Sequence, residues 1–279
     1  MIKKLLLSSV CLILLTVACQ QNNTPNGLTA PEPEHTFVIY GDTRTGHTIH
    51  QQIVNLIMAK SPEAVFHVGD MTDNGDLPSE WAIFDNITRA LQDSTEFFPC
   101  LGNHEHESPL YFQYFNIPES MRYYSVNRFG IHFTIMDSNW PLTSGTDQYN
   151  WVKNDLENSA GDFNIVLLHH PFYSASNAEK VYNELRDTYT SLFQQHNVKI
   201  VFYGHEHNYE RFYIGGIYYI CTGGGGAPLT GQLYSTDFLQ LFLMSYNFCY
   251  LTYDGVNLDI TVYDNEGKEI DSFSFLVNE

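Results

Sequence analysis

Six apolar runs, separated by segments of helical periodicity, constrain most strongly what this chain can fold into. The runs are FVIYGD (37–42), AVFHVGD (64–70), FFPCLGN (97–103), IHFTIMD (131–137), FNIVLLHH (163–170) and KIVFYGH (199–205). Apolar residues recur at helical spacing in 50–60, 80–91, 149–158 and 181–196. Strands and helices that alternate in this way pack as layers, so the sequence predicts an α/β fold.

Two further regions are rich in strand-forming residues and interrupt the alternation. Residues 123–137 hold two β-rich runs around an Asn-Arg-Phe-Gly turn, and residues 246–275 add strands that turn at Asp-Gly and Glu-Gly pairs. No repeat of fixed period and no internal boundary is visible. We therefore expect one domain, residues 36–279, with two mixed β-sheets and a β-rich C-terminal tail.

The apolar runs share an unusual ending, in which metal-binding side chains follow the strand. Four of them end in Gly41-Asp42, Gly69-Asp70, Gly102-Asn103-His104-Glu105 and Gly204-His205-Glu206-His207, and a fifth ends in His169-His170. The carboxyl ends of strands line the ligand crevice in open α/β sheets, so these side chains can converge. Oxygen and imidazole ligands without cysteine suit zinc, iron or manganese in a site that is not a structural zinc site.

Each of these strand-end motifs, taken alone, has a purely structural explanation. A Gly-Asp pair after a strand is typical of a turn, and a single histidine is more often a polar packing residue than a ligand. His67 and His132 lie inside predicted strands and are expected to be such core residues. Turn preference does not account for the whole series of strand ends, which favours a metal site.

The N-terminal residues are typical of an exported lipoprotein. Residues 1–18 combine two lysines with an apolar run that is too short to hold a bilayer, as in a signal peptide. Cys19 follows Leu-Thr-Val-Ala, similar to the motif at which bacterial lipoproteins are lipidated. Residues 19–35 then form a polar tether. We expect a lipid anchor to a bacterial membrane, on the periplasmic side or at the cell surface; the alternative is a secreted protein in which Cys19 has no special role.

The charge balance disfavours nucleic acid as a partner. The formal net charge is −19, with 32 acidic residues against 13 lysines and arginines, whereas binding to nucleic acid begins with cationic side chains that neutralise phosphates. Three cysteines remain besides Cys19 after processing, at positions 100, 221 and 249, which does not suggest a disulfide framework.

Three segments resemble a known family. IVLLHHPFYS (165–174), GHEHNYER (204–211) and YICTGGGGAP (219–228) are similar to motifs of the calcineurin-like metallophosphoesterases, and within them of the purple acid phosphatase branch. The resemblance covers about residues 36 to 225. It implies a four-layer αββα sandwich of two mixed β-sheets flanked by helices, with a dinuclear centre of two divalent or mixed-valence ions of iron, zinc or manganese.

The resemblance also implies a role for each strand-end residue. Asp70 would bridge both metals, Asp42 and His207 would bind the first, and Asn103, His169 and His205 the second. His104 would act at the scissile phosphate as hydrogen-bond donor or acid. The implied activity is hydrolysis of a phosphomonoester or a small phosphodiester by a metal-bridged hydroxide.

The chain departs from the family pattern at the first metal. Where related enzymes carry Asp-x-His this chain has Asp42-Thr43-Arg44, and where purple acid phosphatases carry a ligating tyrosine it has Asp73. The candidates for the missing ligand of the first metal are Asp73, His47, His50 and water. Arg44 is predicted to clamp the substrate phosphate, because a guanidinium pairs with phosphate in a bidentate manner; a structural salt bridge is the alternative.

The predicted function is therefore phosphoester hydrolysis with a phosphorylated small molecule as substrate. An exported ligand-binding lipoprotein on a degenerate phosphoesterase scaffold is the alternative from another class, because the first metal lacks a ligand. A nuclease is disfavoured by the acidic charge. The sequence indicates no oligomeric state.

The lipoprotein hypothesis makes a direct prediction about Cys19. Cells that express the chain and are fed labelled palmitate are expected to label the protein in the membrane fraction. Cys19→Ser should lose the label and release the protein, while Cys100→Ser should keep both. Labelling that survives Cys19→Ser would contradict the anchor.

Overall fold

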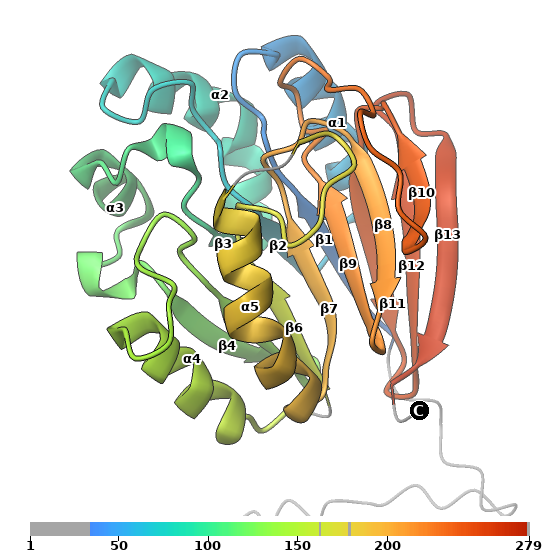
Figure 1. Ribbon diagram of the computed structural model, residues 1–279. Helices are drawn as coiled ribbons and strands as arrows, with labels where there is room; N and C mark the ends of the chain where they lie inside the picture. Colours follow the sequence, from blue (N-terminus) through green and yellow to red (C-terminus); the bar gives the residue numbers. More distant parts are fainter. Residues whose placement is uncertain (1–33, 162, 178–179, 278–279) are drawn as a thin grey trace, which may run out of the picture. The chain divides into compact units, whose positions relative to one another are not determined.

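Two β-sheets packed face to face form the centre of the molecule, and helices cover both outer faces (Figure 1). The computed structural model describes residues 34–161, 163–177 and 180–277. The predicted αββα sandwich of two mixed sheets is confirmed. The predicted signal peptide, Cys19 and nearly all of the predicted tether lie outside the described residues. None of the described helices has the length and apolar character needed to cross a membrane.

The first sheet has six strands in the order β13-β12-β11-β1-β2-β3. Their bounds are β1 His35–Tyr40, β2 Ala64–His67, β3 Glu96–Pro99, β11 Phe248–Tyr253, β12 Asn257–Tyr263 and β13 Glu269–Leu276. β1, β2 and β3 are parallel, whereas the C-terminal strands add on in antiparallel fashion. The carboxyl ends of β1 to β3 therefore lie at one edge.

The second sheet has seven strands in the order β10-β8-β9-β7-β6-β5-β4. Their bounds are β4 Tyr124–Arg128, β5 Ile131–Ile135, β6 Phe163–Leu167, β7 Val198–Tyr203, β8 Tyr209–Ile214, β9 Ile217–Thr222 and β10 Leu239–Leu243. β5, β6, β7 and β9 run parallel, so this sheet also has a common carboxyl edge.

Five α-helices of the described residues complete the outer layers. They are α1 His47–Lys60, α2 Pro78–Ser94, α3 Pro109–Phe115, α4 Asp147–Glu157 and α5 Lys180–Gln195. Apolar residues of α1 and α2 pack on the first sheet, and those of α4 and α5 pack on the second. Short 3₁₀ turns follow β3 at Asn103–Glu105 and α3 at Glu119–Met121.

The continuous apolar character of the central strands follows from burial on both faces. In β1, Phe37 and Ile39 belong to the core between the sheets, while Val38 and Tyr40 belong to the layer under α1 and α2. Neighbouring side chains of a strand point to opposite faces, so a strand covered on both sides has mostly apolar positions. Polar side chains therefore cluster where the strands end.

A partly buried carboxylate joins α4 to the edge of the second sheet. Asp155 accepts hydrogen bonds from Ser125 Oγ at 2.6 Å and Thr134 Oγ1 at 2.8 Å, and lies 2.9 Å from Nε2 of the buried His132. Burial raises the pKa of Asp155, but the bonds to His132, Ser125 and Thr134 outweigh it, so that the pKa lies below its ordinary value.

This network predicts a pH-dependent contribution to stability. A carboxyl whose pKa is lowered by folding stabilises the fold above its unfolded pKa, and the contribution is lost as the pH falls through the folded pKa. We expect Asp155→Asn to reduce the free energy of unfolding in urea by about 1–3 kcal/mol at neutral pH. The difference from wild type should shrink below about pH 4. Asp259→Asn, on the exposed face of β12, is the control; an equal loss at all pH values would contradict the assignment.

Candidate metal centre

The predicted metal ligands lie in the segments that follow the central parallel strands. Asp42 follows β1, Asp70 follows β2, Asn103 follows β3, His169 follows β6, and His205 and His207 follow β7. The segments contact each other through their backbones: Asp42 N donates to Gly69 O at 2.9 Å, and Gly204 N donates to His169 O at 3.1 Å. Bonds also join the two sheets: His205 N donates to Asp42 Oδ2 at 2.9 Å, so the polar ends of the sheets lie against each other.

The glycines beside these ligands are needed for close approach. A Cβ atom on Gly204 would lie 2.1 Å from Asp42 Oδ2, and one on Gly102 would lie 2.2 Å from Asp70 Oδ1. Asp42 and Asp70 themselves adopt a φ of 57°, which is uncommon for residues other than glycine. Strained backbone of this kind often accompanies functional sites.

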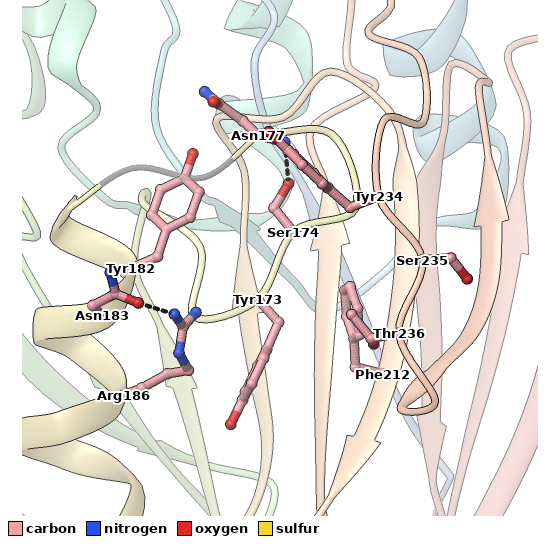
Figure 2. A pocket seen from close by; sticks show the side chains of 10 residues that line it. All are labelled: Tyr173, Ser174, Asn177, Tyr182, Asn183, Arg186, Phe212, Tyr234, Ser235 and Thr236. Carbon is pink, nitrogen blue, oxygen red and sulfur yellow. Dashed lines mark hydrogen bonds between the residues drawn. The ribbon is translucent and has the colours of Figure 1, made fainter.

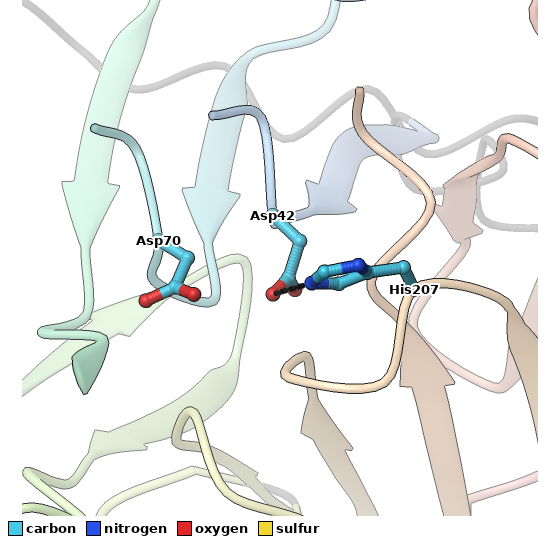
Figure 3. A group of neighbouring side chains, drawn as sticks. All are labelled: Asp42, Asp70 and His207. Atoms are coloured by element: carbon cyan, nitrogen blue, oxygen red, sulfur yellow. Dashed lines mark ion pairs between the residues drawn. The ribbon is translucent and has the colours of Figure 1, made fainter. Parts of the chain in front are cut away.

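Three of the side chains form a first group. Asp42, Asp70 and His207 are buried, and one potential ligand atom from each lies within 4.8 Å of the others. His207 Nε2 is 3.7 Å from Asp42 Oδ1, and Figure 3 shows the imidazole pointing at the Asp42 carboxylate, with Asp70 beside it. The group has the composition expected for the first metal.

A second group surrounds Asn103. Its Oδ1 lies 2.9 Å from His169 Nε2 and 3.0 Å from His205 Nδ1, and these two nitrogens are 3.2 Å apart. Asp70 Oδ1 is 3.3 Å from His169 Nε2. Asp70 is therefore the residue that the two groups share, which is the position that a bridging ligand requires.

Backbone carbonyls orient two of the imidazoles. His169 Nδ1 lies 2.9 Å from Val68 O, and His207 Nδ1 lies 2.8 Å from Pro228 O. A carbonyl oxygen only accepts hydrogen bonds, so Nδ1 carries the proton and Nε2 presents a lone pair to the cluster. Burial also lowers the pKa of both imidazoles and favours the neutral form that binds metal.

The charges of the cluster call for a cation. Burial and the neighbouring Asp70 carboxylate raise the pKa of Asp42 well above its ordinary value. Two buried carboxylates so close together are unfavourable unless positive charge compensates them. Carboxylate, amide and imidazole donors without a thiolate fit zinc, iron or manganese, so the residues present fit the metals that the sequence predicts.

Arg44, Asp73 and His104 lie beside the shared carboxylate. Arg44 Nε is 3.4 Å from Asp70 Oδ2, and Arg44 Nη1 donates to Asp73 Oδ1 at 2.8 Å. His104 Nδ1 lies 2.8 Å from Asp73 O, with Nε2 3.9 Å from Asp70 Oδ2. The salt bridge weighed as the alternative for Arg44 is thus present, and the half-exposed Asp73 carboxylate pairs with Arg44. Arg44 Nε nevertheless is buried and makes no hydrogen bond within the described chain.

The structure does not bring the other two candidate ligands to the cluster. His47 is exposed at the start of α1, and His50 is buried with Nε2 3.5 Å from Tyr40 OH and its ring stacked on Phe84. Burial lowers the pKa of His50 to about 3. The helical period of α1 directs His50 into the packing against α2, together with Ile53 and Ile57.

Sequence reasoning missed the role of Glu105. This buried carboxylate accepts backbone N–H bonds from Gly102 at 2.7 Å, Asp70 and Met71 at 2.9 Å, and Thr72 at 3.2 Å. Burial and the Asp70 carboxylate raise its pKa to about 8, while the backbone N–H groups oppose the shift. One side chain thus joins the segments that carry Asp70 and Asn103. Its place in the Gly-Asn-His-Glu run was the available signal.

Together, the layered fold and the buried cluster define an α/β domain with a candidate metal site at the carboxyl ends of parallel strands. The chain belongs to the calcineurin-like phosphoesterase family, because the sequence profile described as "Calcineurin-like phosphoesterase" matches residues 35–209.

The relatives agree with the purple acid phosphatase branch. A phosphoenolpyruvate phosphatase of Allium cepa is 28% identical over 71% of this chain and 46% of its own length, and purple acid phosphatase 5 of Arabidopsis thaliana is 28% identical over 76% and 54%. The chain thus spans about half the length of these curated relatives.

Solved structures share the fold. The structure of a purple acid phosphatase from yellow lupin (Lupinus luteus) aligns with a TM-score of 0.77 at 21% identity, over 87% of this chain and 54% of that one. GAP50 of Plasmodium, described as the anchor in the inner membrane complex, aligns with a TM-score of 0.70 at 17% identity, over 88% and 90%.

The position of Glu105 predicts an indirect effect on metal binding. Glu105→Gln replaces one of the acceptor oxygens by a donor that faces backbone N–H groups. We expect metal affinity, measured by competition with a chromogenic chelator, to fall about 10–100-fold. Glu266→Gln, in an exposed turn, should have no effect; unchanged affinity in a folded Glu105→Gln protein would remove Glu105 from the support of the centre.

Proposed function

We propose that this protein is a metal-dependent phosphoesterase that hydrolyses the phosphate ester of a small molecule with the help of two transition-metal ions. The observation that carries the proposal is the pair of ligand groups that share Asp70. Membership of the calcineurin-like phosphoesterase family supports it, as do relatives named as phosphatases.

Each group would hold one metal ion. Asp42, Asp70 and His207 form the first set, and Asp70, Asn103, His169 and His205 form the second. When bound, the ions supply Lewis acidity toward the phosphoryl oxygens and a lowered pKa for water. They also balance the Asp42 and Asp70 carboxylates, which makes binding of an anionic substrate possible in a chain with a net charge of −19.

The reaction is the transfer of a phosphoryl group to water. An oxygen of water forms a bond to phosphorus and releases one proton to solvent, the bond from phosphorus to the leaving oxygen breaks, and the leaving oxygen receives a proton. His104 is placed to donate that proton from Nε2, since Nδ1 is engaged with the carbonyl of Asp73. Arg44 Nε, ion-paired with Asp70 Oδ2 at 3.4 Å, makes no hydrogen bond within the described chain, and the guanidinium can bind a phosphoryl oxygen.

A ligand-binding protein without turnover is the second candidate. One observation favours it: the Asp73 carboxylate, which replaces the expected ligand, pairs with Arg44, and this leaves three protein ligands in the first group. One assay distinguishes the two candidates. If the metal-loaded protein binds phosphate esters but does not hydrolyse them, the ligand-binding protein is favoured. For either function, we propose that Cys19 anchors the protein to the outside of a bacterial membrane.

Kinetics of two variants test the proposed roles together. A group that protonates the leaving oxygen matters most for poor leaving groups, so His104→Ala should lower kcat about 10²–10⁴-fold with an alkyl phosphate and much less with p-nitrophenyl phosphate. Arg44→Ala should mainly raise KM, about tenfold or more.

Arg89→Ala, in an exposed ion pair of α2, is the matched control and should behave as wild type. Equal losses of His104→Ala on both substrates would refute its role as acid. Absence of hydrolysis by the metal-loaded wild type, or hydrolysis that a chelator does not reduce, would refute the proposed function itself.

A further inference from the structure

A cavity of about 360 Å³ includes in its lining Tyr182, whose ring contacts that of His205, and none of the predicted site residues lines it. It lies between α5, β8 and two loop segments (Figure 2). One segment, residues 173–177, continues directly from His169 and His170. The other, residues 234–236, follows Pro228, whose carbonyl orients His207. The two segments are tied together, because Leu233 N and Tyr234 N both donate to Ala175 O at 2.8 Å.

Tyr182 lines the cavity and also contacts a predicted ligand of the metal centre. Its ring lines the cavity, and its centroid lies 6.4 Å from that of His205, edge to face. Its hydroxyl donates to Glu206 Oε1 at 2.7 Å, next to the same ligand. Tyr182 thus connects this cavity to His205, the residue at which a substrate phosphate would lie.

Aromatic rings dominate the cavity lining. Tyr173, Tyr182, Phe212 and Tyr234 contribute to its walls. Tyr173 and Phe212 already contact each other, with ring centroids 5.8 Å apart. Rings in such a setting stack favourably on another planar ring. The volume is within the usual range of small-ligand sites.

Arg186 adds a positive charge to this lining. The other arginines in the described part of the chain, at 44, 89, 122, 128 and 211, each form an ion pair with an acidic side chain. Among the described residues, Arg186 is bonded to neutral groups: Nη1 donates to Phe172 O and Nη2 to Asn183 Oδ1. Its guanidinium also lies over Tyr173, 5.2 Å from the ring centroid.

Arg186 has no carboxylate partner within residues 34–161, 163–177 and 180–277, which is notable in so acidic a chain. A guanidinium has five N–H donors, and two are used in the bonds that Arg186 makes with the described residues. The remaining donors and the uncompensated charge suit an anion, for which a carboxylate has matching geometry. The cavity thus combines the recognition of a ring with the recognition of an anion.

We propose that this cavity binds the leaving group of the substrate, and that this leaving group is an aromatic ring that carries a carboxylate. The inference rests on the proposed phosphoesterase function and narrows its substrate class to aryl phosphate monoesters with an acidic substituent. Arg186 is the residue that determines specificity for the carboxylate, and Tyr234 contributes to specificity for the ring.

The test compares three substrates with the metal-loaded, full-length protein: 4-carboxyphenyl phosphate, phenyl phosphate and glycerol 2-phosphate. The wild type should prefer them in that order by kcat/KM. Arg186→Met should lower the preference for carboxyphenyl over phenyl phosphate about tenfold, and Arg186→Lys should lower it less. Tyr234→Ala should lower the preference for phenyl over glycerol phosphate severalfold. Ratios within each variant cancel differences in folding and metal content.

Arg89→Met is the control and should keep both ratios. The product 4-hydroxybenzoate should inhibit competitively against phenyl phosphate, and its equilibrium binding, followed by protein fluorescence, should weaken in Arg186→Met. Hydrolysis with the same ratios in wild type and Arg186→Met, or non-competitive inhibition, would overturn the subsite and leave the phosphoesterase function standing. Absence of hydrolysis of all three substrates would instead overturn the phosphoesterase function.

Discussion

The repulsion between two buried carboxylates is the constraint on which the site depends. Asp42 and Asp70 are held at the ends of adjacent parallel strands, away from water, and burial together with the Asp70 charge raises the pKa of Asp42. Only a cation can make both charges favourable there. The neutral, oriented imidazoles of His169 and His207 add ligands without adding charge.

The scaffold holds these groups together at some conformational cost. Glycines at 102 and 204 allow the backbone to approach the carboxylates, and Asp42, Asp70 and His205 all have positive φ. The four backbone N–H bonds of Glu105 fix the segment around Asp70 against the segment of Gly102. Rigid support of this kind is what a site needs to hold its ligands in place when the ions leave.

The sequence predicted the convergence of the ligands because the carboxyl ends of parallel strands share an edge, a rule that applies within a sheet across long separations such as that between Asp42 and Asn103. The approach of His169 to Asp70 depends in addition on the packing of the two sheets. The sequence could not predict pairings made by side chains across loops. Arg44 binds Asp73, 29 residues away, and the residues around Arg44 in the sequence carry no signal for this pairing. His50 was a candidate by proximity to Asp42, yet the helix period of α1 turns it into the core. The α3 helix and the β8–β9 hairpin have weak local patterns and were not expected, and the cavity around Arg186 depends on segments that meet only in the folded chain.

The central claim is that Asp70 belongs to two metal sites at once. Metal stoichiometry after loading with manganese or zinc, measured by elemental analysis of the desalted protein, tests it most directly. The account predicts two ions per chain in the wild type, one in His207→Ala, and none bound tightly in Asp70→Ala. Two ions retained in Asp70→Ala, or a single ion in the wild type, would contradict it.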